Sequence, residues 1–79
     1  MKNERFETSD FGLVIYLSLT FPIIEIARSI DSKRALFIFE KTPELIQEID
    51  NYWHGDAKVN PQKYHLQSKI IKSRLYENA

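Results

Sequence analysis

Apolar and polar positions alternate along the middle of the chain, in the stretches "IIEIARSI" and "RALFIFEK", which "DSK" joins. This alternation, with many β-branched and aromatic residues, predicts an antiparallel β-hairpin, because successive side chains of a strand face opposite sides of a sheet. The inner face of the hairpin is expected to carry Ile24, Ile26, Ile30, Ala35, Phe37 and Phe39.

The spacing changes to that of a helix in "KTPELIQEIDNYWHG". Thr42 is the predicted N-cap, Pro43 takes the first helical position, and Gly55 ends the helix. One side of this helix is apolar and is predicted to be buried, Trp53 included. That side consists of Leu45, Ile46, Ile49, Tyr52 and Trp53, and the other side consists of Glu44, Gln47, Glu48, Asn51 and His54.

A further helix with the same start signal is predicted from residue 61 to residue 76, with Asn60 as N-cap and Pro61 at its first position. Its apolar side is broad and consists of Tyr64, Leu66, Ile70, Ile71 and Leu75. The far side carries His65, Lys69, Lys72 and Tyr76, which fall within about 60° of one another at helical spacing.

An apolar run near the N-terminus, "ETSDFGLVIYLSLT", predicts a helix from about residue 9 to residue 19, although its residues would also suit a buried strand. Thr8 or Ser9 is the expected N-cap and Asp10 is expected in the first turn. Phe21-Pro22 ends this helix, because proline cannot continue it.

The short segment "DAKV" after Gly55 is long enough for a short strand. The predicted fold class is therefore α+β, with the order α-β-β-α-(short β)-α and an antiparallel hairpin packed against three helices. Residues 1–79 are expected to form a small single domain, with residues 1–7 flexible or a short extended arm and residues 77–79 frayed.

The length of 79 residues limits the core. A chain this short supplies a net stability of only a few kcal/mol, roughly 3 to 5. It has no cysteine, so neither disulfide bonds nor a structural zinc site can make up for the small core. A partner or a second copy would add stability, and the ten aromatic residues suit an interface.

The net charge is zero, which argues against a dedicated electrostatic DNA-binding protein. The charges are nevertheless separated along the chain. Residues 40–56 contain five acids and one lysine, whereas residues 58–74 contain five cations and no acid. The middle of the chain is therefore negative and its end positive.

No membrane span is expected, because "FGLVIYLSLTFPII" is shorter than the roughly 20 apolar residues that cross a bilayer. The N-terminal segment lacks the cleavage site of a signal peptide. Together with the absence of cysteine, these features favour a soluble cytoplasmic protein.

Catalysis is not expected, since the chain has no cysteine nucleophile, no G-x-S-x-G and no glycine-rich phosphate loop. His54, Asp56 and Lys58 could imitate an acid-base set, but they are also ordinary residues for a helix end and a turn. We expect no catalytic residues, no cofactor, no metal site and no small-molecule substrate.

Two binding functions fit the sequence. The first is a non-catalytic interaction module that forms a homodimer or binds a protein partner, with partner contacts through Glu44, Glu48 and Arg34. An exposed edge of the hairpin could also add a strand from another chain. The alternative is an accessory nucleic-acid-binding protein that uses Lys63, His65, Lys69, Lys72, Arg74 and Tyr76, although a lysine-rich side is also common on solvated helices.

Several short motifs are shared with a known group of domains. They are Thr8 and Asp10 in a T-x-D pattern, Phe37 and Phe39 in F-x-F, an aromatic-x-x-G ending at Gly55, Val59 to Pro61, and the K-x-x-K of Lys69 and Lys72. In these features the chain resembles a family of short prokaryotic and phage domains of unknown function, over nearly its whole length. The shared residues are mostly packing and capping residues, so the resemblance implies a common fold and no activity.

Overall fold

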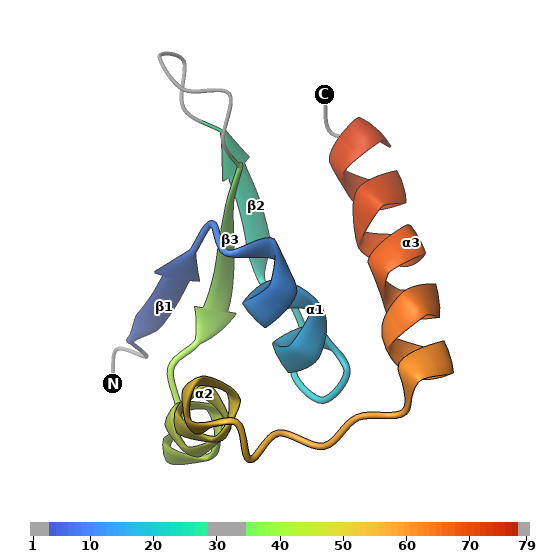
Figure 1. Cartoon of the computed structure of the whole chain (residues 1–79). Coiled ribbons are helices and arrows are strands. Elements are labelled where there is room, and N and C mark those ends of the chain that lie inside the picture. Colours follow the sequence, from blue (N-terminus) through green and yellow to red (C-terminus); the bar gives the residue numbers. More distant parts are fainter. Residues whose placement is uncertain (1–3, 29–34, 78–79) are drawn as a thin grey trace.

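The computed structural model describes residues 4–28 and 35–77 (Figure 1). Three strands form an antiparallel sheet in the order β1-β3-β2, with β1 at Arg5–Thr8, β2 at Glu25–Arg28 and β3 at Ala35–Glu40. The predicted hairpin is confirmed as the β2–β3 pair, and its inner face carries Ile26, Ala35, Phe37 and Phe39 as expected. The prediction was wrong for Ile24, which lies before β2 and is 45% exposed. The turn of the hairpin, with Ile30 and Arg34, lies outside the described residues.

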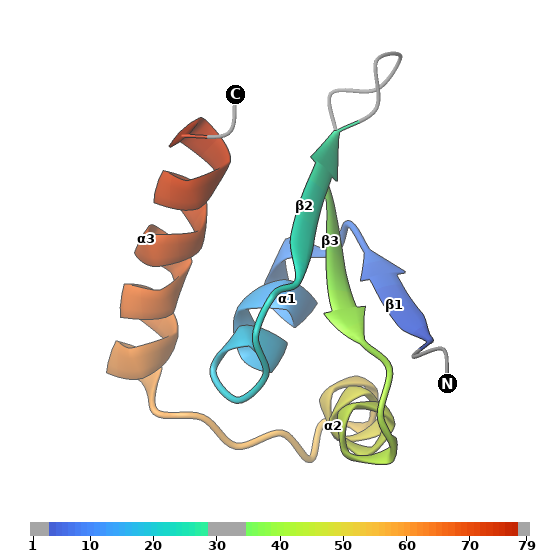
Figure 2. The ribbon, with the colours of Figure 1, turned by 180° about the vertical axis from the view of Figure 1, so that it is seen from behind.

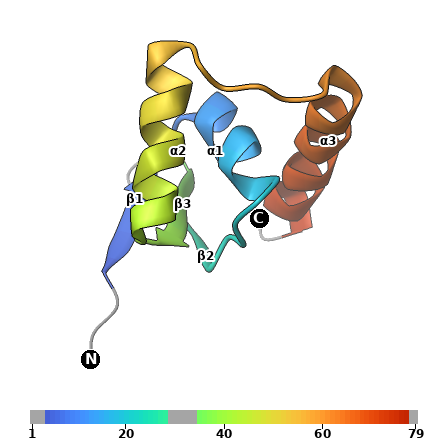
Figure 3. The same ribbon diagram turned by 90° about the horizontal axis from the view of Figure 1, so that it is seen from below.

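The third strand comes from the N-terminus. Arg5–Thr8 pairs with β3 so that Phe6 lies opposite Phe39, and alternate residues of β1 are partly buried. The short strand expected at residues 56–59 does not form, because these residues belong to the link that joins α2 to α3 away from the sheet (Figure 3). The fold class α+β is confirmed, and the element order is β-α-β-β-α-α.

Helix α1 spans Phe11–Ser18, within the predicted range. Its N-cap is Asp10, whose carboxylate accepts a hydrogen bond from the backbone N–H of Leu13 at 3.2 Å. The expectation that Thr8 or Ser9 would cap the helix was wrong, because Thr8 is the last residue of β1. The Thr8 hydroxyl instead accepts a hydrogen bond from the backbone N–H of Asp10 at 3.1 Å.

The other two helices begin at the predicted residues, α2 also ends as predicted, and α3 ends one residue later than predicted. Helix α2 spans Pro43–His54, with the Thr42 hydroxyl accepting from the Leu45 N–H at 3.1 Å and with Gly55 in the left-handed region at φ 79°. Helix α3 spans Pro61–Glu77, and the Asn60 side chain accepts hydrogen bonds from two N–H groups of its first turn. The capping residues that were read from the sequence therefore set both helix starts.

The helices are arranged around α1, which lies between α2 and α3 (Figure 3). Both α2 and α3 pack against α1, and α1 covers one face of the sheet. The buried core gathers apolar residues from all of these elements and from the segment before β2. It consists of Leu13, Val14, Leu17, Ile23, Phe37, Phe39, Leu45 and Ile71.

The other face of the sheet lies in front in Figure 2, with α1 behind it. Ile38 is on this face and is only 5% exposed. Arg5 and Glu25 come from the two outer strands and form an ion pair at 3.3 Å across the central strand, with Glu25 opposite Ile38 and Arg5 opposite Glu40. The residues that flank Ile38 on the outer strands are therefore Glu7 and Glu25.

Gly12 allows three helices to approach one another. A Cβ at this position would lie 2.6 Å from the hydroxyl oxygen of Tyr52 on α2. The hydroxyl of Tyr64 on α3 donates a hydrogen bond to the Gly12 carbonyl at 3.4 Å. The close packing of Tyr52 thus requires that residue 12 has no side chain. This explains why a glycine stands here, although glycine destabilises a helix relative to alanine.

We predict that Gly12→Ala lowers the stability of the domain. Alanine in place of a helical glycine ordinarily adds about 1 kcal/mol, but the clash with Tyr52 should instead cost about 1 to 3 kcal/mol. Thermal unfolding should show a melting temperature several degrees lower, since 1 kcal/mol corresponds to about 4–8 °C in a domain of this size. The double variant Gly12→Ala, Tyr52→Phe should recover most of the loss. An unchanged or higher melting temperature for Gly12→Ala alone would contradict this packing.

Candidate functional site

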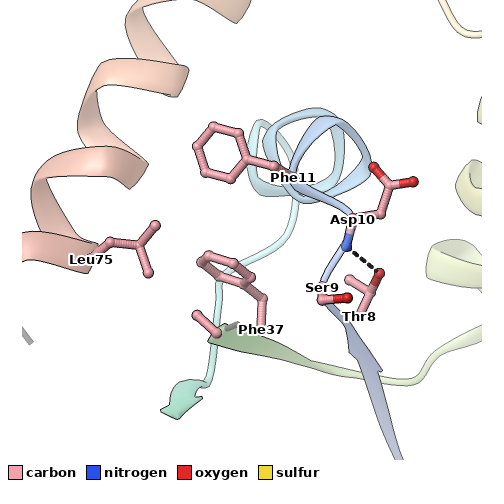
Figure 4. Close-up of a pocket in the computed structure, with 7 residues that line it drawn as sticks. Thr8, Ser9, Asp10, Phe11, Phe37 and Leu75 are labelled. Atoms are coloured by element: carbon pink, nitrogen blue, oxygen red, sulfur yellow. Dashed lines mark hydrogen bonds between the residues drawn. The ribbon is translucent and has the colours of Figure 1, made fainter. Parts of the chain in front are cut away.

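A hollow of about 550 Å³ lies between the N-terminus of α1, strand β3 and the C-terminal part of α3 (Figure 4). Figure 4 shows the Phe11 ring, the Phe37 ring and the Leu75 side chain extending toward the same space from three different elements. The two rings are tilted, with centroids 6.3 Å apart. The full lining is Thr8, Ser9, Asp10, Phe11, Ala35, Phe37 and Leu75.

A second hollow, of about 370 Å³, continues the first one, because both are lined by Phe11, Ala35 and Leu75. Its remaining lining residues are Arg28, Lys72 and Tyr76. We call the two hollows together the α3 groove. Its middle is apolar and aromatic, one end has hydroxyl groups and a carboxylate, and the other end has two cations and a phenol.

Arg28 is the one member of the α3 groove that joins β2 to α3. Its guanidinium donates a hydrogen bond to the backbone carbonyl of Leu75 at 3.0 Å. No local signal in the sequence could have paired Arg28 with a residue 47 positions away. Only the placement of α3 beside the end of β2 brings Arg28 to Lys72 and Tyr76.

The residues predicted to contact nucleic acid divide between two sides of α3. His65, Lys69, Lys72 and Tyr76 are all exposed and share one side, and this side includes the rim of the α3 groove. Lys63 and Arg74 lie on a different side, more than about 120° away by helical spacing. Arg74 is also half-buried. The structure therefore assembles four of the six residues, and adds Arg28 to them.

Of the three residues predicted to contact a partner, the structure describes Glu44 and Glu48, which both lie on α2. Glu44 is exposed at the start of α2, and Arg34 lies outside the described residues. Glu48 is half-buried, and its carboxylate accepts a hydrogen bond of 2.5 Å from the hydroxyl of Tyr16 on α1. Asn51 donates a further hydrogen bond to Glu48 at 3.4 Å. Glu48 thus has a structural role in joining α2 to α1.

The hydrogen bond to Glu48, then burial, and then the negative charge of Glu48 raise the pKa of Tyr16 to about 12. Burial is also the main cause that raises the pKa of Tyr52, with a smaller effect from Asp10. Tyr16 and Tyr52 are neighbours, with ring centroids 5.6 Å apart. The contact between α1 and α2 therefore depends on neutral phenols.

The outward sides of α2 and α3 are more apolar than the sequence predicted. Trp53 was expected in the core but is 60% exposed. Its ring packs edge-on against that of Tyr52, with the ring centroids 5.1 Å apart. Leu66 and Ile70 were also expected to be buried, but they are 58% and 52% exposed. These predictions were wrong because each helix contacts α1 along one narrow side, whereas its apolar residues are spread more widely.

These exposed residues define two surfaces. The outer face of α2 consists of Ile46, Asp50 and Trp53, which are all exposed and follow one another at helical spacings of four and three. The outer face of α3 consists of Leu66 and Ile70, four residues apart, with Lys63, Lys69 and Arg74 around them.

The three residues considered as an acid-base set, His54, Asp56 and Lys58, lie exposed at the end of α2 and in the link that follows it. One ring nitrogen of His54 is engaged with the backbone carbonyl of Asp50 at 2.8 Å. Within residues 4–28 and 35–77, no group of three or more His, Asp or Glu side chains is placed to hold a metal ion. None of the helices in this part of the chain is long and apolar enough to cross a membrane.

The fold and its surfaces define a small α+β domain in which three helices pack around a three-stranded antiparallel sheet. Residues 3–77 match the model of a family described as "Domain of unknown function (DUF5659)". Because the match covers nearly the whole chain, the chain belongs to this family, which agrees with the resemblance read from its motifs. Comparison with curated proteins and with solved structures gave no match.

Two of the shared motifs have their structural role at helix α1. The T-x-D motif forms the N-terminal cap of α1, in which the Thr8 hydroxyl accepts from the Asp10 N–H and the Asp10 carboxylate accepts from the Leu13 N–H. The aromatic-x-x-G motif places Tyr52 against α1 and ends α2 at Gly55. Lys69 and Lys72 of K-x-x-K are exposed instead, so packing does not account for them.

We predict that the stabilising effect of Tyr16 disappears in alkaline solution. A pKa raised from 10.0 to about 12 means that the folded state favours the neutral phenol, so the contribution is complete below pH 10 and is lost as the pH rises from 10 toward 12. Urea unfolding of the wild type and of Tyr16→Phe should therefore differ by a constant free energy from about pH 8 to about pH 9.5, and by less at about pH 11. A difference that grows with pH would contradict the assignment.

Proposed function

We propose that this protein is a non-catalytic interaction module that associates with itself through the outer faces of α2 and α3. The observation that carries the proposal is the exposure of Trp53, Leu66 and Ile70 on two helices of so small a domain. Clustered apolar side chains on a protein surface mark interaction sites, and tryptophan is enriched where binding energy is concentrated.

The polar groups of the α3 groove support a non-catalytic role. The Asp10 carboxylate caps α1, and the Thr8 hydroxyl accepts a hydrogen bond from the backbone. A catalytic nucleophile and its base would instead have to bond to each other. The location that goes with the proposal is the cytoplasm, on the sequence grounds given above.

The proposal predicts a molecular mass that depends on concentration. Light scattering should give at least twice the chain mass of 9.4 kDa at high concentration and the single-chain mass on dilution, and the melting temperature should rise with concentration. The double variant Leu66→Gln, Ile70→Gln should remain a monomer, because it removes exposed apolar surface at no cost to the core.

The matched control is Ile24→Gln, which replaces an apolar side chain of similar exposure, 45%, on the segment before β2. This variant should associate as the wild type does. A wild type that keeps the single-chain mass at every concentration would contradict self-association.

A second candidate function is the binding of single-stranded nucleic acid at the α3 groove. The observation in its favour is that Lys72 and Tyr76 share their hollow with Arg28, so cations from two elements lie beside the exposed ring of Tyr76. Cations can bind phosphates, and bases stack on aromatic side chains.

This candidate predicts a gel shift with short single-stranded oligonucleotides at low salt. Lys69→Gln, Lys72→Gln should weaken binding strongly and reduce the slope of affinity against salt by about 1 to 2. Lys63→Gln, Arg74→Gln changes the charge by the same amount on another side of α3 and should bind nearly as the wild type. Equal loss in both variants would show a general charge effect and would exclude a site at the groove.

A further inference from the structure

We infer that self-association is head to tail: the outer face of α3 on one copy of the chain docks on the outer face of α2 on another copy. This inference rests on the proposed function and adds to it which surfaces meet. It follows from three properties of the two faces, namely their apolar residues, their opposite charges and their positions on the domain.

The apolar residues of each face lie along one side of their helix. Leu66 and Ile70 are four residues apart on α3, and Ile46 and Trp53 are seven residues apart on α2, so each pair forms a ridge along its helix. Ridges formed by residues four apart pack into the grooves of another helix at the common crossing angles. The exposed indole of Trp53 is the largest apolar group available to fill such a contact.

The charges decide which faces meet. Helix α2 contains three acidic residues and no lysine or arginine. One of the acids, Asp50, lies between Ile46 and Trp53 on the outer face. On α3 every charged residue from Pro61 to Tyr76 is basic, with Lys69 on one flank of the apolar pair and Lys63 and Arg74 on the other. Pairing α3 with α3, or α2 with α2, would bring like charges together, whereas pairing α2 with α3 brings opposite charges together.

The two faces of one chain do not meet each other. Helices α2 and α3 lie on different sides of α1, and the link over residues 56–60 spans the distance between them (Figure 3). Each copy therefore offers one acidic face and one basic face to its neighbours. Such a contact either closes into a dimer or ring, in which both faces of every copy are used, or continues as a chain.

Trp53 reports directly on the inferred contact, because it is the only tryptophan of the chain and lies on the α2 face. Its fluorescence should be that of a water-exposed indole at low concentration and should shift to shorter wavelength as the wild type associates. In Leu66→Gln, Ile70→Gln, which alters only α3, the emission should stay at the long-wavelength position at all concentrations. Ile24→Gln should shift as the wild type does.

The emission and the mass together separate the inference from the proposed function. Association by mass without any shift of the Trp53 emission would overturn the α2–α3 contact while leaving self-association intact. A single-chain mass at every concentration would overturn both.

A charge exchange provides the second test. Asp50→Lys makes the α2 face basic, and Lys69→Glu adds an acid to the α3 face. Each variant alone should have a dissociation constant raised about tenfold, whereas an equimolar mixture should associate nearly as the wild type, because each altered face then meets an altered partner of opposite charge. A mixture that associates as weakly as the separate variants would overturn the inference. Circular dichroism and melting of each variant at low concentration establish that the monomers are folded.

Discussion

Helix α1 has only eight residues, yet Leu13, Val14, Ile15 and Leu17 on it are all buried. It is apolar on nearly every side, so the sheet, α2 and α3 pack against it from different directions. This shared contact determines the rest of the structure. Because α2 and α3 each contact the core along one side, the apolar residues on their other sides have no place in it.

Hydrogen bonds between distant elements hold the outer helices in position around this centre. Tyr16 bonds Glu48 on α2, Tyr64 bonds the Gly12 carbonyl from α3, and Gln67 of α3 bonds the Ser18 hydroxyl at 3.1 Å. Each such bond contributes only about 1 kcal/mol of net stability. Their value lies in geometry, since they fix how each helix is turned and therefore which residues face outward.

The same arrangement separates two surfaces on α3. The side with Lys72 and Tyr76 borders the groove, and the side with Leu66 and Ile70 faces away from the core. A second copy docked on the outer face leaves the groove side of the helix accessible. The proposed self-association and the proposed binding at the groove therefore use different residues, apart from Lys69, which lies between the two surfaces.

The sequence by itself determined the local elements. Thr42 and Gly55 bound α2, Asn60 begins α3, and the alternation around Phe37 and Phe39 specifies a central strand, because caps, turns and alternation act through neighbours in the chain. The tertiary structure alone decided how the elements are used. Contacts between segments far apart in the sequence decide whether Trp53 is buried, whether Arg28 reaches α3, and whether the N-terminal residues pair with β3. No local pattern encodes how much of a helix a small core can cover.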